Sequence, residues 1–310
     1  MIRTTIMAAG LALAVTLPIA PAQAAAVRTF LSAAGSDSNT CANVATPCRH
    51  MAAAYAATAV NGEIFVLDPA NYGSLTITHG VSIEGHGWAS IAPITGQAAI
   101  TISANPGDNI NIIGVVLDGA ALAGTTGIAF NSGGSLVVRD SVIRNFGGSG
   151  IALAPNSSAE FAVSNTLVAN NDGLGIYVQP SGTNTNVIAV FNRVEAYNNI
   201  LGIGLYGNFA TGASSIEATA VDCVTSNNSD AGYYVLGGTI HTNFQVFRST
   251  SQGDNIGVKA EAGGQAYVSQ SNLADGLPWS NTSGTGIVLS YGDNNNTANF
   301  SAPNGLVAKH

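Results

Sequence analysis

A glycine followed by a short apolar run recurs along the chain. Steps of 23, 25, 27, 30, 25 and 29 residues separate its copies, which begin at Gly127, Gly150, Gly175, Gly202, Gly232, Gly257 and Gly286. Self-similarity at a period of about 20 to 50 residues is typical of repeat architectures. Because glycine tolerates a positive φ, we expect it at a tight corner of each repeat. The pattern predicts a solenoid with one coil per period.

Each period holds a second strand upstream of its glycine. Residues 136–142, 161–167 and 188–194 show the alternation of apolar and polar residues that is typical of a half-buried β-strand. Continued to the end of the first two segments, this alternation places Val142 and Leu167 in the interior. Each coil is therefore expected to contribute at least two short strands.

Two polar columns follow when the repeats are aligned on these strands. The first is formed by Asp140, Asn165, Asn192 and Asp222. Its alternation with core residues predicts that it points inward at a corner. The second consists of asparagines five residues before a motif glycine, namely Asn145, Asn170 and Asn227. Because stacked amides donate and accept hydrogen bonds, we expect the second column to form an inward ladder along the axis.

Short strands and turns rich in glycine, asparagine and serine, without helical periodicity after residue 60, predict an all-β fold. The dense leucine frame of leucine-rich repeats and the six-residue rhythm of left-handed β-helices are both missing. The predicted fold is a right-handed parallel β-helix with an N-terminal α-helical cap. Its coils, about 8–9 in number, span residues 62–291, and residues 292–310 form a C-terminal tail or cap.

Residues 25–61 precede the coils and carry two further features. The alanine-rich segment 46–59, with Thr46 as N-cap, predicts an α-helix that covers the exposed core of the first coil. Cys41 and Cys48 stand in a stretch rich in small polar residues. In an exported protein they favour a loop disulfide, whereas Cys223 lies in an apolar run and is expected to be buried.

Residues 1–24 have the features of a secretory signal peptide. Arg3 precedes an apolar stretch, and Ala22, Gln23 and Ala24 form a small-residue cleavage site. No later segment offers 18 uninterrupted apolar residues, so we expect no transmembrane segment after signal removal. The predicted localisation is secreted, whether extracellular, periplasmic or at the cell surface.

Charge is scarce, at 8% of residues, and the formal net charge is −8. An acidic balance argues against a nucleic-acid partner, which would require a basic face. Stacked coils place equivalent residues about 4.8 Å apart, so a column of like charges would be repulsive. The scarcity of charge therefore fits a solenoid, and it limits the residues available for catalysis.

The N-terminal part of the mature chain resembles a known group. Residues 30–39, the Thr-Pro-Cys-Arg segment at 46–49, and residues 62–69 together resemble the N-terminal signature of secreted bacterial right-handed parallel β-helix repeat proteins, within the pectin-lyase-like group. The resemblance implies the fold over essentially the whole mature chain. It implies no particular reaction, because the group includes lyases, hydrolases, adhesins and members of unknown role.

Two arginines are the candidates for catalysis. A β-eliminating polysaccharide lyase needs a base, and Arg193 and Arg248 would lie on one face about 10 Å apart. Alternatively, Arg248 turns inward and pairs with Asp222. A hydrolase needs paired carboxylates, but Asp140 and Asp222 would be about 14 Å apart. No cofactor is expected, and Ca²⁺ is a possibility only for a lyase.

Other candidates concern binding. Tyr177, Tyr206 and Tyr234 would stack on sugar rings or, equally, pack against loops. Asp293, in a run of asparagines, is a candidate for contact with a cation, with a turn as the alternative. His86 stands between two glycines in a turn that is more simply structural than catalytic.

The leading hypothesis is a secreted, non-catalytic protein that recognises an extracellular or cell-surface glycan. Missing catalytic sets and the small number of basic residues favour it. The alternative is a polysaccharide lyase, or a glycoside hydrolase, that acts on an extended uronic-acid polysaccharide in a groove of the β-helix. A purely structural surface protein is the second alternative. The expected partner is an extracellular polysaccharide or a cell surface.

Overall fold

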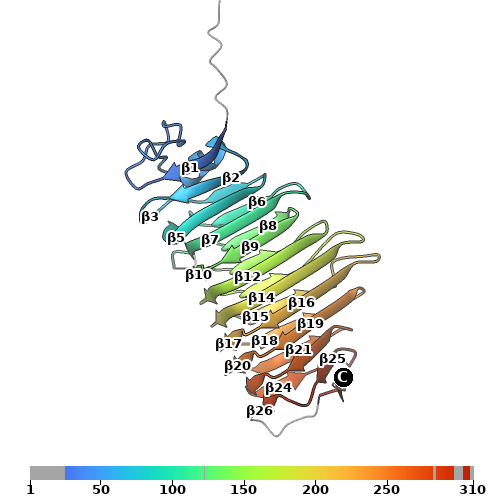
Figure 1. The fold of residues 1–310 in the computed structure, drawn as a ribbon. Helices are drawn as coiled ribbons and strands as arrows, with labels where there is room; N and C mark the ends of the chain where they lie inside the picture. Colours follow the sequence, from blue (N-terminus) through green and yellow to red (C-terminus); the bar gives the residue numbers. More distant parts are fainter. Residues whose placement is uncertain (1–24, 122, 282–283, 297–302, 308–310) are drawn as a thin grey trace, which may run out of the picture.

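The computed structural model describes residues 25–121, 123–281, 284–296 and 303–307. The chain winds into an elongated stack whose coils follow one another from the N-terminal to the C-terminal end (Figure 1). Strands of successive coils pair in parallel and form two sheets. The prediction of an all-β parallel solenoid with very little helix is therefore confirmed.

The smaller sheet has nine strands in chain order. These are β4 (Leu75–Ile77), β6 (Ile100–Ser103), β8 (Ile128–Ser132), β11 (Ile151–Leu153), β13 (Ile176–Val178), β15 (Leu201–Tyr206), β18 (Ala231–Leu236), β21 (Ile256–Glu261) and β24 (Leu277–Ser280). Most of these strands begin at or next to the glycine of the repeat motif.

The larger sheet has 18 strands. In several coils, two consecutive strands are the two halves of one strand that is interrupted by a bend. Its first half contains β1 (Ala26–Leu31), β2 (Thr58–Val66), β3 (Ala70–Asn71), β5 (Val81–Ile91), β7 (Asn109–Asp118), β9 (Ser135–Arg139), β10 (Val142–Arg144), β12 (Ala159–Ala169) and β14 (Asn186–Tyr197). Its second half contains β16 (Ser215–Val221), β17 (Val224–Ser226), β19 (His241–Phe247), β20 (Thr250–Gln252), β22 (Gln265–Ser269), β23 (Asn272–Ala274), β25 (Ile287–Ser290), β26 (Asn295–Asn296) and β27 (Gly305–Leu306).

The repeat glycines are needed for close packing between coils. A Cβ atom at Gly150, Gly175 or Gly202 would lie 2.7, 2.5 or 2.5 Å from the carbonyl oxygen of the matching glycine in the next coil. Their φ angles lie outside the left-handed region, so the expectation of a positive-φ corner is wrong for these three. Glycine recurs there because a side chain would push neighbouring coils apart.

From the coil of Asp140 to that of Arg248, the larger sheet bends sharply once per coil at a residue other than glycine in the left-handed region. Its φ is 54° at Asp140, 48° at Asn165, 51° at Arg193, 54° at Asp222 and 46° at Arg248. A left-handed residue interrupts the alternation of a strand, so the side chains beyond it change sides. The prediction that the strand ends at residues 142 and 167 point inward is wrong for this reason: Ser141 and Thr166 are buried there instead, and Val142 and Leu167 are half-exposed.

The register at the bend also differs from the predicted alignment. Ser164 pairs with Asn192, and Thr166 pairs with Val194, so that Arg193 rather than Asn192 stands beside the bend residue of the preceding coil. The column Asp140, Asn165, Arg193, Asp222 and Arg248 is moreover exposed, which corrects its predicted inward orientation. A left-handed residue at the apex of a bend directs its side chain away from the core.

An inward polar ladder exists, one residue after the predicted asparagines. Asn145, Asn170 and Asn227 occupy left-handed corners, with φ of 61°, 56° and 54°. The next residue of the later coils turns inward, and this inner polar row consists of Asn171, Asn199, Asn228, Asp254 and Asp275. The inward polar ladder is therefore present, but it lies one residue after the predicted asparagines.

The N-terminal segment contains the helix α1 (Met51–Ala57), preceded by His50 at the N-cap position. The predicted start at Thr46 is wrong because Cys48 is held in extended form against β1, where its N–H donates to the Phe30 carbonyl at 2.9 Å. Met51, Ala54 and Tyr55 are the buried residues of the helix. Its role as a cap of the first coil stays a prediction.

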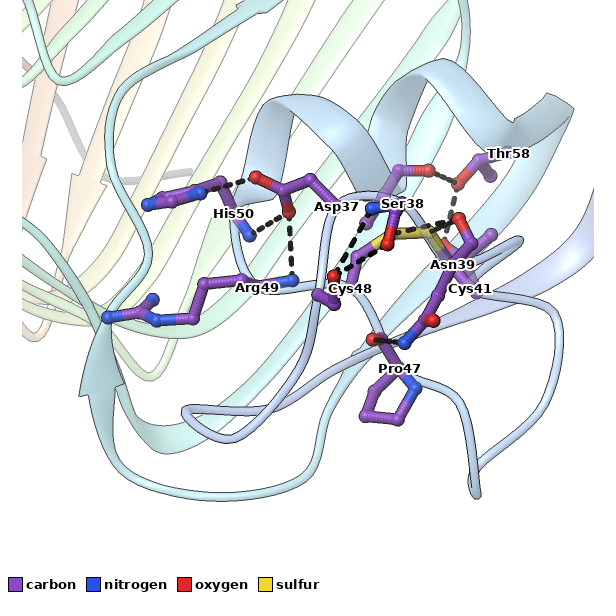
Figure 2. The surroundings of a disulfide bond; sticks show 12 residues. Asp37, Ser38, Asn39, Cys41, Pro47, Cys48, Arg49, His50 and Thr58 are labelled. Carbon is purple, nitrogen blue, oxygen red and sulfur yellow. Dashed lines mark hydrogen bonds and ion pairs between the residues drawn. A yellow bond between two sulfur atoms is a disulfide. The ribbon is translucent and has the colours of Figure 1, made fainter.

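The predicted disulfide between Cys41 and Cys48 is present, with the two Cα atoms 5.0 Å apart (Figure 2). Asp37 fixes the same loop, since its Oδ1 accepts the backbone N–H groups of Arg49 and His50, both at 2.9 Å. Cys223 is free and buried, as predicted. The signal-peptide assignment falls on residues 1–24, which lie outside the described residues. None of the described helices is long and apolar enough to cross a membrane.

Candidate functional site

The bend of the larger sheet carries an exposed line of polar side chains, here called the outer polar row: Asp140, Asn165, Arg193, Asp222 and Arg248. Asn165 Nδ2 donates to Asp140 Oδ1 at 3.0 Å, and Arg193 Nε donates to Asn165 Oδ1 at 2.6 Å. Hydrogen bonds thus link three successive coils on the outside of the solenoid. The row runs along the stack, because each coil contributes one member.

A groove follows the first three coils of this row. Its volume is about 500 Å³, and its lining consists of Asp140, Ser141, Val142, Asn165, Thr166, Leu167, Arg193 and Glu195. This bend groove exists because the backbone turns at the left-handed residue and leaves a concave surface beside it. It combines charged groups of both signs with the half-exposed apolar side chains of Val142 and Leu167.

Arg193 and Arg248 lie on the same face, two coils apart, as the sequence suggested. Arg193 pairs in register with Asp222 of the next coil, and Arg248 follows one coil later. At about 4.8 Å per coil their backbones are about 10 Å apart. Only Arg193 lines the bend groove. The two arginines therefore share a face without converging on one point.

Arg248 pairs with Asp222, on the exposed side rather than inside. Its Nε donates to Asp222 Oδ1 at 2.8 Å and its Nη2 donates to Oδ2 at 3.0 Å. Donation of hydrogen bonds to the Asp222 carboxylate raises the pKa of Arg248, and the same bonding lowers the pKa of Asp222. A general base needs a lowered pKa, so this environment works against such a role for Arg248.

Glu195 is the groove residue that the sequence interpretation missed. It stands two positions after the bend, and its Oε2 accepts a hydrogen bond from the Tyr197 hydroxyl at 3.1 Å. The alignment that put Asn192 in the bend column left Glu195 unnoticed. The step of 27 residues between Gly175 and Gly202 points to Asn192, so the glycine spacing gave no signal for the 28-residue step that the register shows at the bend.

Tyr177, Tyr206 and Tyr234 lie together on the outside of the smaller sheet, away from the bend groove. Their ring centroids are 6.3 Å apart for Tyr177 and Tyr206, and 5.2 Å apart for Tyr206 and Tyr234. Gly204 pairs between Tyr177 and Tyr234 and leaves room for the Tyr206 ring. Burial raises the pKa of all three hydroxyl groups, and Tyr234 is only 6% exposed.

Tyr234 is a buried member of a second apolar cluster, together with Leu201, Ala231 and Ile256, and Tyr206 packs against it. Lys259 lies beside the last of the three tyrosines, with its Nζ 5.5 Å from the centre of the Tyr234 ring. The Tyr234 hydroxyl donates to Glu261 Oε2 at 2.7 Å. Packing therefore accounts for their positions, and their predicted contact with sugars stays a prediction.

Asp293 holds a bend of the preceding coil. Its Oδ2 accepts from the Ser269 hydroxyl at 3.0 Å, and its Oδ1 accepts from the Gln270 N–H at 3.1 Å. Within the described ranges, no group of three or more His, Cys, Asp or Glu side chains is placed to hold a metal ion. These bonds give Asp293 a role in joining two coils, and both the predicted cation contact and its turn alternative stay predictions.

A second groove, of about 530 Å³, lies at the other edge of the same outer face. Glu160 is its one charged lining residue, beside neutral groups such as Asn109, Ser135, Asn186 and Ile188. Although it is slightly larger, it offers fewer groups that would orient a polar ligand. The bend groove is therefore the better candidate site.

Comparison with known proteins shows a likeness in fold. No family model and no curated protein matches the sequence. Among solved structures, the crystal structure of pectate lyase Pel9A is similar with a TM-score of 0.60, at 13% sequence identity over 91% of this chain and 78% of that one. At this identity the likeness concerns the fold alone. The chain shares the parallel β-helix fold of a pectate lyase, as its resemblance to the pectin-lyase-like group implied.

Proposed function

We propose that the protein is a secreted, non-catalytic protein that binds an extracellular or cell-surface polysaccharide along the bend groove. The observation that carries the proposal is the groove itself. It is open, follows successive coils, and presents Asp140, Asn165, Arg193 and Glu195 beside apolar side chains. Hydrogen-bonding groups repeated at each coil suit an extended, repeating ligand better than a compact one.

Export belongs to the same proposal. The sequence features of residues 1–24 are those of a signal peptide, and the disulfide between Cys41 and Cys48 is of the kind that persists in oxidising compartments. We also propose that the coils wind in a right-handed sense and that α1 caps the first coil. They would give a stable rod on which an outer face is free for binding.

The contacts of the arginines support binding over catalysis. Arg248 is held by Asp222 through two hydrogen bonds, and Arg193 by Asn165 through one. A paired guanidinium is well placed to orient a ligand and poorly placed to remove a proton. The fold likeness to a pectate lyase supports a polysaccharide as the ligand class.

The catalytic alternative has one observation in its favour. Asp140, Arg193 and Glu195 line the same groove, so two carboxylates and a cation face one ligand site. A lyase would release an unsaturated product that absorbs in the ultraviolet, and a hydrolase would release reducing ends. Either activity would be sought with uronic-acid and neutral polysaccharides, in the presence and absence of Ca²⁺.

A glycan array with the mature protein tests the proposal, followed by titration calorimetry of the best ligand. We expect Arg193→Ala to weaken binding about tenfold, since it removes a charge-assisted contact from the groove. Arg144→Ala is the matched control, because Arg144 is an exposed arginine paired with Asp118 outside the groove. Product release that is lost in Arg193→Ala would overturn the non-catalytic assignment. Absence of any binding would favour a structural surface protein.

A further inference from the structure

Beyond the bend groove, the same outer face holds a small pocket lined by aromatic side chains. Its volume is about 220 Å³, and its lining residues are Gln245, Val246, Phe247, Tyr267, Ser269 and Tyr291. Phe247, Tyr267 and Tyr291 are half-exposed, and they come from three successive coils. We call this the aromatic pocket. Three rings around one concave surface bury apolar area at fixed positions.

Two rings of the aromatic pocket, those of Tyr267 and Phe247, are held in place before any ligand arrives. The Tyr267 hydroxyl donates to Gln265 Oε1 at 2.9 Å. The Arg248 guanidinium lies 4.5 Å from the centre of the Phe247 ring and is itself bonded to Asp222. One face of Phe247 is thus covered by a fixed cation. A pre-organised pocket loses less entropy on binding than a flexible one.

The position of the aromatic pocket relates it to the bend groove. Val221 pairs with Phe247, and Asn192 pairs with Val221, so the Phe247 backbone lies two coils beyond that of Asn192, or about 10 Å along the stack. The neighbouring residues Arg193 and Arg248 belong to the outer polar row. A chain that follows this row from the groove therefore reaches the pocket.

Charge around the aromatic pocket disfavours an acidic ligand. The cation of Arg248 is neutralised by Asp222, and Asp293 bonds to Ser269, which lines the pocket. Carboxylates thus stand near the pocket beside the Arg248 cation, in a protein whose formal net charge is −8. A uronate would meet a net negative field, whereas a neutral sugar has no charge to be repelled.

We propose that the aromatic pocket is a subsite for one ring of a neutral polysaccharide whose chain continues into the bend groove. The inference rests on the proposed function and makes its ligand specific. Pockets for drug-sized ligands measure about 300 to 1,000 Å³, so a cavity of about 220 Å³ suits a single ring. Tyr267 and Tyr291 supply stacking surfaces, while Gln245 and Ser269 supply polar groups for ring hydroxyls.

The test measures the affinity of the mature protein for xylohexaose, mannohexaose, maltohexaose and hexagalacturonate by titration calorimetry. At least one neutral hexamer should bind, and hexagalacturonate should bind at least tenfold more weakly. Tyr267→Ala and Tyr291→Ala should each weaken the affinity for the neutral hexamer about three- to tenfold. Phe209→Ala serves as the control, because Phe209 is an aromatic residue with 53% exposure that does not line the pocket.

A second readout keeps the test valid if a tyrosine variant folds poorly. In protein with ¹³C-labelled tyrosine, ring signals of Tyr267 and Tyr291 should shift when the neutral hexamer is added, whereas the Tyr55 signal should stay in place. Unchanged affinity in both variants, or stronger binding of hexagalacturonate, would overturn this inference and leave groove binding intact. If none of the four hexamers binds, and the array is also negative, both proposals fail together.

Discussion

Two polar rows run along this solenoid, and they obey opposite rules. The inner polar row is buried, with exposed fractions of 3%, 5% and 1% at Asn171, Asn199 and Asn228. The outer polar row is exposed and contains Asp140, Asn165, Arg193, Asp222 and Arg248. Both contribute one residue per coil, so the difference between them reflects their surroundings rather than the repeat.

Amide side chains dominate the inner polar row because an amide both donates and accepts hydrogen bonds. Asn199 Nδ2 donates to Asn228 Oδ1 at 3.1 Å, and the same oxygen accepts the Asn199 N–H at 3.0 Å. A buried charge is costly unless it is fully bonded. Outside, water screens charge, so acidic and basic residues occur together and pair where they meet, as Asp222 and Arg248 do.

The inner row changes character at its C-terminal end, where two carboxylates replace the amides. Asp254 accepts four hydrogen bonds, from the Asn228 N–H, Asn228 Nδ2, the Thr225 hydroxyl and the Ser251 hydroxyl. Asp275 Oδ1 accepts the Asp254 N–H at 3.0 Å, but its Oδ2 has no hydrogen-bond partner within the part of the chain described. Asp275 is therefore the weak member of the row.

The largest expected effect comes from breaking the inner row in its middle. Asn228→Ala removes the acceptor of two donors on Asn199 and the donor to the Ala196 carbonyl, all of them buried. Because each unsatisfied buried group costs about 1 to 3 kcal/mol, we expect a loss of about 3 kcal/mol in the free energy of unfolding. Urea denaturation followed by circular dichroism measures it.

Asn165→Ala is the matched variant in the outer row, since it also removes an asparagine that links two neighbouring coils. Its stability should fall by only about 1 kcal/mol, because the groups it leaves behind are solvated and the loss comes mainly from placing alanine in the left-handed conformation of Asn165. Equal losses in the two variants would show that burial does not separate the rows.

The next effect concerns pH and sharpens the contrast within the inner row. Burial, together with the nearby carboxylate of Asp254, raises the pKa of Asp275 to about 6. The neutral form thus stabilises the fold below about pH 4, and this contribution is lost as the pH rises through 6. Asp275→Asn supplies a permanently neutral side chain with a donor in place of Oδ2.

We expect Asp275→Asn to be more stable than wild type by about 2 kcal/mol near pH 8 and nearly equal to it near pH 4. Denaturation at a series of pH values measures the difference. Asp140→Asn, an exposed acid of the outer row, should show no comparable change between these pH values. If Asp275→Asn is less stable than wild type at every pH, the carboxylate has a role that the hydrogen bonds do not show.

The smallest effect is expected for the exposed ion pair of the outer row. Arg248→Ala removes two hydrogen bonds to Asp222, but both partners face water. Its melting temperature should be that of wild type within error, because exposed ion pairs contribute little to stability. A clear drop would indicate that the Arg248 stack on Phe247 supports the fold.

Much of the architecture was readable in the sequence. Six of the seven motif glycines located strands of the smaller sheet, and the spacing of asparagines indicated an inner ladder. The sequence did not predict which residues line the bend groove, because one left-handed residue per coil reverses the alternation of inward and outward side chains. Asp140 and Asn165 belong to types that adopt this conformation readily, whereas Arg193 and Arg248 do not. The bend was therefore hard to predict at Arg193, the arginine that lines the groove.

We propose that the outer polar row binds a ligand while the inner polar row maintains the fold. Hydrogen–deuterium exchange with mass spectrometry tests it directly, using the mature protein with and without its best glycan ligand. Peptides that cover residues 139–144, 164–168 and 192–196 should exchange more slowly when the glycan is bound. Protection confined to the smaller sheet, at residues 174–178, 201–206 and 231–236, would contradict the claim.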